Sequence, residues 1–127
     1  MLHAPITPTA TPVMTPAHYL HLCRKASGLA IGAVAGRITP RHSQRSRIAA
    51  HIRLLETHGV TAKRRRDIER LAAIFALDVD VYFQLATQPA EHHPHICPGC
   101  GWSLNDRRPR CTRRRYSVSC ADLREAA

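Results

Sequence analysis

Apolar residues recur at helical spacing between residues 16 and 86, and short polar breaks divide them into segments. Thr15 followed by Pro16 is typical of a helix start, and Gly28 falls where the first apolar stripe ends. The alanine-rich stretch 30–38 predicts a second helix despite its two glycines. The patterned part of the chain is therefore expected to open with two short helices.

A longer helix is expected in "SQRSRIAAHIRLLETHG", residues 43–59, with Gly59 as its C-cap. "TAKRRRDIERLAAIFAL" predicts a fourth helix, and "DVDVYFQLA", residues 78–86, predicts a fifth that begins at an Asp cap. No alternating strand pattern precedes residue 90. We expect an all-α body of four or five short helices. Its predicted core is Leu22, Ile48, Ile52, Leu55, Ile68, Leu71, Ala72, Phe75 and Phe83, with Cys23 as a small apolar residue among them.

Composition divides the chain into four parts. Residues 1–15 are rich in proline, threonine and alanine and are expected to form a mobile extension, although Met14 offers a second plausible start. Residues 16–86 form the helical domain, and residues 87–96 are a linker with proline and histidine. Residues 97–127 hold four of the five cysteines but few large aliphatic residues, so this tail needs a staple or stays disordered.

The chain carries 19 lysines and arginines against 9 acidic residues, a formal charge of +10, and lysine occurs only at Lys25 and Lys63. The planar guanidinium of arginine suits phosphates and guanine edges, which favours nucleic acid as a partner, although GC-rich genomes also encode arginine-rich proteins. No apolar run approaches the length of a membrane span, and the N-terminus lacks the pattern of a secretory signal. Five cysteines without such a signal indicate a reducing cytoplasm.

Two basic segments are candidates for contacts with DNA. The first covers the start of the third helix, where glutamine can bind adenine and arginine can bind guanine, and the second could clamp phosphates near the next helix. An ordinary solvated face is the alternative for each of these charges. The candidate DNA-binding residues are Arg41, Gln44, Arg45, Arg47, His51, Lys63, Arg64, Arg65 and Arg66.

Four motifs in this order resemble the Cro/lambda-repressor-like (XRE) helix-turn-helix family: "LCRKASGL", Val34-Ala35 with Arg37-Ile38, "IRLLE" at 52–56, and "LAAIFALDVDVYFQL". The resemblance covers roughly residues 16–86 and implies a DNA-binding domain whose third helix enters the major groove. One departure is that the stretch between the second-helix alanine and Glu56 is several residues longer than usual. The additional residues fall in "ITPRHSQRS", at the turn or at the start of the recognition helix.

The tail begins with "CPGCGW", in which Cys97 and Cys100 have the spacing of one half of a zinc site. Cys111 and Cys120 are the simplest completion of four ligands, and His95 or His93 in place of Cys120 is the rival. "CPGCGWSLND" also resembles the cysteine-rich endings of some small bacterial helix-turn-helix proteins. Zinc would then order a basic finger that contains "RRPRCTRRRY" and adds contacts to DNA or RNA.

The alternatives for this tail are disorder with incidental cysteines and, less favoured, a redox or catalytic site. No nucleophile–base constellation or phosphate-cradling glycine loop occurs, so we expect no enzyme. The sequence predicts a cytoplasmic, sequence-specific DNA-binding regulator with one structural Zn²⁺, and "DVDVYFQLA" is the candidate surface for a homodimer. The competing class is a protein-interaction adaptor of phage or mobile-element type whose charge is incidental.

Overall fold

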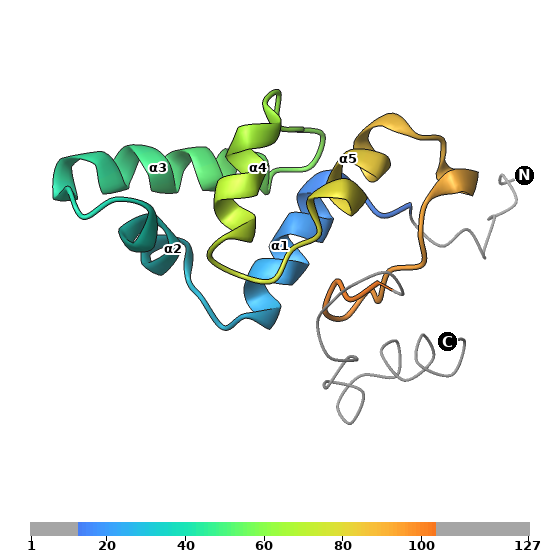
Figure 1. Ribbon diagram of the computed structural model, residues 1–127, viewed down its shortest axis with the longest axis horizontal. Coiled ribbons are helices and arrows are strands. Elements are labelled where there is room, and N and C mark those ends of the chain that lie inside the picture. Colours follow the sequence, from blue (N-terminus) through green and yellow to red (C-terminus); the bar gives the residue numbers. More distant parts are fainter. Residues whose placement is uncertain (1–12, 104–127) are drawn as a thin grey trace, which may run out of the picture.

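The computed structural model describes residues 13–103, and within this range the regular structure is helical apart from one isolated β-bridge. The arrangement is drawn in Figure 1. In chain order the elements are α1 (Pro16–Ala26), α2 (Ile31–Ile38), α3 (His42–Leu55), α4 (Arg65–Ala72), α5 (Val79–Thr87) and the 3-10 turn η1 (Ala90–His92). The predicted all-α fold class is confirmed for these residues. None of these helices has the length and hydrophobicity that a bilayer crossing requires.

Two helix starts follow directly from the side chains that cap them. The hydroxyl of Thr15 accepts the backbone N–H of His18 at 3.1 Å, and Pro16 occupies the first helical position of α1. The carboxylate of Asp78 accepts two backbone N–H groups in the first turn of α5. Residues 13–15, which were assigned to the extension, therefore lead into the folded body, and Met14 packs against its core.

α2 and α3 are joined by a short turn, Thr39-Pro40-Arg41. Pro40 cannot continue a helix, and the buried Thr39 hydroxyl accepts the N–H of Arg41 at 3.2 Å, which fixes the turn. α3 is 14 residues long. Of the segment "ITPRHSQRS", residues 42–46 therefore belong to the first turns of α3, and the turn itself is limited to residues 39–41.

Two predicted helix ends are wrong. α3 ends at Leu55 with Glu56 as its C-cap, whereas Gly59, with φ of 88°, lies in the turn that follows. α4 ends at Ala72, so Phe75 belongs to the connection before α5 although its side chain is buried. The apolar pattern identified the buried positions, but it did not define where the helical hydrogen bonds stop.

The core lies where α1, α4 and α5 meet the C-terminal half of α3. Of the predicted core residues, Ile48, Ala72 and Phe83 are half-buried and the others are buried. Two buried tyrosines add hydrogen bonds to this core: the hydroxyl of Tyr19 accepts the N–H of Asp78 at 3.1 Å, and the hydroxyl of Tyr82 accepts the N–H of Ala62 at 2.9 Å. Burial raises the pKa of Tyr82, and the Ala62 hydrogen bond offsets part of that rise.

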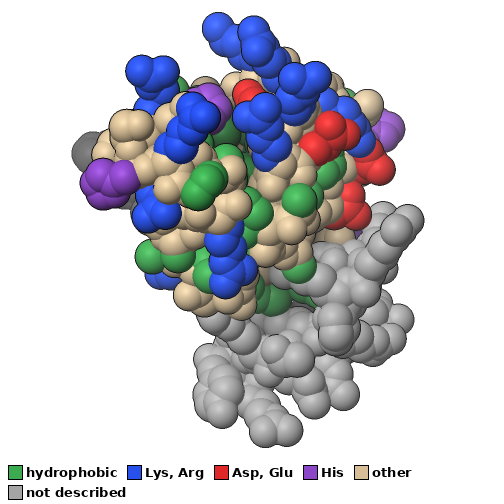
Figure 2. Space-filling model, turned by 60° about the vertical axis from the view of Figure 1, so that its left-hand side comes forward, with side chains coloured by type: hydrophobic (Ala, Val, Ile, Leu, Met, Phe, Trp, Pro, Cys, Tyr) green, Lys and Arg blue, Asp and Glu red, His purple; other side chains and the backbone are tan. Residues whose placement is uncertain are grey.

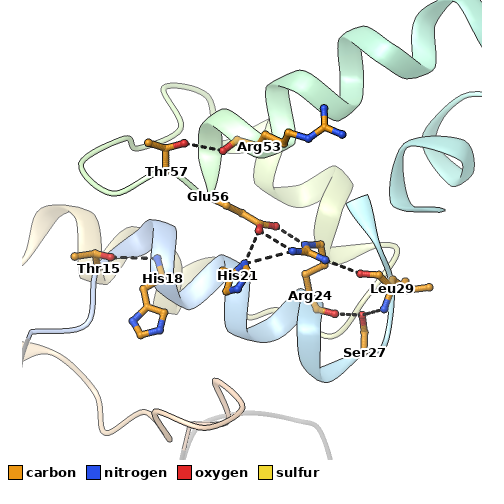
Figure 3. A network of polar contacts seen from close by, with 9 residues as sticks. All are labelled: Thr15, His18, His21, Arg24, Ser27, Leu29, Arg53, Glu56 and Thr57. Carbon is orange, nitrogen blue, oxygen red and sulfur yellow. Dashed lines mark hydrogen bonds and ion pairs between the residues drawn. The ribbon is translucent and has the colours of Figure 1, made fainter. Parts of the chain in front are cut away.

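Glu56 connects the end of α3 to α1 through a partly buried ion pair, shown in Figure 3. Arg24 donates from Nε to Oε2 at 2.6 Å and from Nη2 to Oε1 at 2.9 Å, and its Nη1 donates to the carbonyl of Leu29 at 2.8 Å. The side chains of Arg24 and Glu56 are 11% and 7% exposed. This bidentate geometry is the strongest that an arginine and a carboxylate form.

His21 completes this ion pair. Its Nδ1 lies 2.6 Å from Oε1 of Glu56 and 3.3 Å from Nη2 of Arg24. Because a carboxylate oxygen accepts and does not donate, Nδ1 carries the proton, and the Arg24 contact with that nitrogen is not a hydrogen bond. Burial raises the pKa of the Glu56 carboxyl, but the hydrogen bonds and charges of Arg24 and His21 outweigh it and hold the pKa below its ordinary 4.5.

Candidate nucleic-acid interface

The N-terminal half of α3 is exposed on every side chain from His42 to Arg47. Its end lies at the far left of Figure 1, away from α1 and α5. The first turn contains no acidic residue, and no side chain caps the first backbone N–H groups of α3. This end of α3 combines exposed cations with the positive end of the helix dipole.

Two of the predicted DNA-binding residues in this half also hold the turn. Gln44 Oε1 accepts the hydroxyl of Thr39 at 3.1 Å. Arg45 donates from Nε to the carbonyl of Thr39 at 3.3 Å and from Nη2 to the carbonyl of Pro40 at 3.2 Å. Gln44 and Arg45 are therefore oriented by the turn, and Thr39 is the residue of this site that the sequence analysis did not identify.

Arg41 and Arg47 make no such contacts with the described residues and are exposed. His51 lies farther along α3, where its Nε2 is 3.7 Å from a carboxylate oxygen of Asp67 at the start of α4. The predicted set on α3 thus separates into two outward-facing arginines, two residues that brace the turn, and one histidine that contacts α4.

The second basic segment, Lys63 to Arg66, lies at the N-terminus of α4. Arg65 pairs with Asp80 and with Glu69, and its guanidinium lies 5.6 Å from the centre of the Phe83 ring. These contacts join α4 to α5. Lys63, Arg64 and Arg66 form no ion pair among residues 13–103 and remain exposed. Three of these four cations therefore face solvent unpaired.

Charge is distributed unevenly along the chain, since no aspartate or glutamate precedes Glu56. Figure 2 brings the N-terminal end of α3 forward and shows lysine and arginine side chains over much of that face, with the acidic side chains mostly to one side. The face formed by α2 and α3 is therefore positive without internal compensation. A surface of this kind attracts polyanions and concentrates them at close range.

The first cysteine pair of the tail forms a knuckle, residues 96–103. The backbone N–H of Cys97 donates to the Trp102 carbonyl at 2.7 Å, and the N–H of Gly101 donates back to the Cys97 carbonyl at 2.8 Å. The N–H of Gly99 points at the Cys97 sulfur at 3.3 Å. Cys97, Cys100 and Trp102 are buried together in one cluster. A backbone N–H directed at sulfur favours a thiolate, which is the form that binds metal.

This knuckle packs on α1. Gly101 has φ of 79°, and a Cβ added to it would lie 2.9 Å from the sulfur of Cys23 and 3.3 Å from Cβ of Leu22. Ala26 also packs against the cysteine cluster. The predicted burial of Cys23 is confirmed. Its contact with Gly101 gives it a role in seating the knuckle that the sequence did not indicate.

The described residues supply two thiols to the predicted zinc site, from Cys97 and Cys100. Cys111 and Cys120 lie outside the described residues, and within 13–103 no three metal-binding side chains come together. Of the rival ligands, His93 contacts the carbonyl of Gln88 through Nε2 at 2.7 Å. Two buried cysteines on a tight turn fit one half of a zinc site.

The segment 78–86, predicted as a dimer surface, faces inward in the described fold. Val81, Tyr82 and Leu85 are buried in the core, and Phe83 is covered in part by Arg65. Dimerisation remains a prediction, but the apolar residues that suggested it lie within the body.

Comparisons of the chain with protein-family models, curated proteins and solved structures found no match.

Proposed function

We propose that this protein binds double-stranded DNA in a sequence-specific manner and acts as a transcriptional regulator. In this proposal α2 and α3 act as a helix-turn-helix pair, and the N-terminal half of α3 enters the major groove, which is wide enough for one helix. Arg41 and Arg47 contact bases or phosphates, and the side chains of Gln44 and Arg45 approach from the turn that orients them. Lys63, Arg64 and Arg66 contact the backbone phosphates.

The observation that carries this proposal is the exposed half of α3. α3 contributes to the core only from residue 48 onward, through Ile48, Ala49, Ile52 and Leu55, so every side chain from His42 to Arg47 stays exposed at the end of the helix that points away from α1 and α5. Those turns are polar, contain no acid, and rest on a turn braced by Thr39. A rigid, cationic helix end is suited to reading a groove because little conformational freedom is lost on binding.

The test is a selection of genomic fragments with the purified full-length chain at about 150 mM salt, where purely electrostatic binding is weakened. Enrichment of a few short sites supports the proposal and gives the spacing of any half-sites. Even recovery of all fragments that vanishes as the salt concentration rises contradicts it. In that case the charge is an unspecific surface, and a protein-interaction adaptor becomes the better description.

We also propose that the knuckle is one half of a structural zinc site completed by Cys111 and Cys120. The burial of Cys97 and Cys100 and the Gly99 N–H directed at sulfur support this assignment. Zinc would supply folding free energy to a tail with few large apolar residues. No catalytic role is proposed for it.

Cobalt titration tests the zinc proposal, because thiolate coordination gives Co²⁺ strong absorption bands. We expect the full chain to bind one Co²⁺ that Zn²⁺ displaces. Cys97→Ser and Cys111→Ser should each weaken binding, and His18→Ala, which removes an exposed metal-binding side chain outside the proposed set, should not. Equal binding by Cys111→Ser and the unmodified chain would contradict the completion by that residue.

A further inference from the structure

A pocket of about 290 Å³ lies between the C-terminal half of α3 and α4. Most of its wall is apolar and comes from three helices. The apolar residues that line it are Ile38, Ile48, Ile52, Leu55 and Leu71. Water in such a pocket finds few hydrogen-bond partners, so an apolar occupant that displaces it gains free energy.

The polar lining is confined to four side chains, Arg47, His51, Asp67 and Arg70. His51 and Asp67 lie 3.7 Å apart and face each other. Arg47 and Arg70 are exposed and form no ion pair with any residue in the described range. The lining thus carries two guanidinium groups, from Arg47 and Arg70, against one carboxylate, from Asp67, beside an apolar wall. This excess of positive charge favours an anionic group on the occupant.

We propose that this pocket binds a small amphipathic anion, with a compact apolar body and one carboxylate. The body fills the space against Ile48 and Leu71, and the carboxylate pairs with Arg70 and Arg47. The volume lies at the lower end of the range for small-molecule sites, which limits the occupant to roughly a dozen non-hydrogen atoms. A DNA phosphate would gain nothing from the apolar wall. This site therefore differs from the proposed groove-binding surface in its apolar wall, although Arg47 belongs to both.

Naphthalene-1-acetate is a suitable probe, and naphthalene-1-acetamide is its matched neutral control. Both are titrated into isotope-labelled full-length chain and followed by NMR of the methyl groups. We expect the carboxylate to shift the signals of Ile38, Ile48 and Leu71, with a dissociation constant on the order of 1 mM or below. The amide should bind at least about tenfold more weakly, a difference of about 1.4 kcal/mol.

Arg70→Gln should weaken binding of naphthalene-1-acetate about tenfold. Arg53→Gln, an equal loss of charge on α3 outside the pocket, should leave the affinity unchanged. Thermal unfolding of both variants shows whether they are equally folded. Equal affinity for the acid and the amide, or for Arg70→Gln and the unmodified chain, would overturn the anionic part of the proposal. Absent or scattered shifts would overturn the site itself.

The titration contains no DNA, so its outcome does not depend on the proposed regulatory function. A chain that binds the probe but selects no DNA site retains this pocket and loses the proposed function. If the chain selects DNA sites but shows no methyl shifts, the proposed function is retained and the pocket proposal is overturned.

Discussion

At its C-terminal end α3 is held by the buried side chains of Ile52 and Leu55 and by the ion pair of Glu56 with Arg24, whereas between residues 42 and 47 it has no buried side chain at all. The helix α3 thus has an anchored half, residues 48–55, and a presented half, residues 42–47. The anchored half fixes the direction in which the presented half points. In the proposed function, the anchored half holds in place the half that contacts DNA.

The arginines near the two halves of α3 differ in their contacts. Arg24 is 11% exposed and donates to two carboxylate oxygens and a carbonyl. Arg47 is exposed and has no partner of this kind. Arg65, in the second basic segment, is exposed like Arg47 but pairs at the surface with Asp80 and Glu69, which offset part of its charge. A count of arginines therefore overstates the charge available to a ligand.

Removal of the anchor should have the largest effect. Glu56→Ala leaves the half-buried Arg24 without its carboxylate, so we expect a loss of about 2–3 kcal/mol in the free energy of unfolding. Urea denaturation measures this loss. Glu69→Ala is the matched control because Glu69 is exposed and its pair with Arg65 is a surface contact, for which we expect less than about 1 kcal/mol. Similar losses in the two variants would contradict the anchoring role of Glu56.

Changes in the presented half should affect binding and not stability. Arg47→Ala is expected to weaken binding to a selected DNA site by about 1–3 kcal/mol, because a guanidinium contact with a base or phosphate is lost. Fluorescence anisotropy at fixed salt measures this. Arg53→Ala, on the anchored half of the same helix, should change the affinity by less than twofold. Both variants should unfold within about 0.5 kcal/mol of the unmodified chain.

Acid should lower the free energy of unfolding through protonation of Glu56 in the anchored half. The pKa of Glu56 is lowered in the folded state, so its contribution to stability is complete above the ordinary value of 4.5 and is lost as the pH falls through the lowered pKa. Urea unfolding between pH 6 and pH 3 measures the slope. Glu56→Gln cannot titrate at this position and should show a shallower dependence on pH. The same slope in both proteins would assign the acid sensitivity to other carboxylates.

The seat of the knuckle offers a test outside α3. Gly101→Ala would place a methyl group within 2.9 Å of the Cys23 sulfur at a positive φ, so we expect a cost of about 1–3 kcal/mol. The only tryptophan, Trp102, is buried in the knuckle, and its fluorescence should shift to longer wavelength. Gly32→Ala is the control, since its Cβ would meet no atom of another element within 4 Å and should stabilise the helix by about 0.5–1 kcal/mol. Unchanged Trp102 emission in Gly101→Ala would contradict the tight packing of Gly101 against Cys23.

The smallest effect is expected at the loop before α4. Tyr82→Phe removes the acceptor of the buried Ala62 N–H and should cost about 1 kcal/mol. Because that loop carries Lys63 and Arg64, the salt dependence of DNA binding should also become slightly weaker. Phe83→Leu is a neighbouring change that spares the hydrogen bond. An equal effect of the two variants on the salt dependence would assign the result to general packing of α5.

Much of the fold could be predicted because local chemistry determines it. The caps Thr15 and Asp78 and the break at Pro40 each act within a few residues of themselves. Gly59 does not mark the end of α3, because a tight turn with its own hydrogen bonds separates Leu55 from Gly59. The ion pair of Glu56 with Arg24 on α1 could not be predicted either. A partner that is remote in the sequence leaves no local pattern.

In the candidate site, too, local features could be predicted from the sequence and remote contacts could not. The basic segments were visible in the sequence, and the structure places them at the exposed starts of α3 and α4. That Arg65 pairs with Asp80 and that Arg45 turns back to the Thr39 carbonyl could not be predicted, because both depend on where other side chains lie. The unpaired Arg70 beside an apolar pocket depends on the packing of three helices.

The close approach of Gly101 to Cys23 restricts which residues can occur at these two positions, one in the knuckle and one in α1. A larger side chain at position 23 would meet the knuckle backbone, and any side chain at position 101 would meet α1. Substitutions that are neutral in an isolated helix or an isolated knuckle are therefore harmful when the two are joined. The helical body and its tail must vary together, so a recombinant that takes each from a different relative should fold poorly unless both contact residues are inherited as a pair.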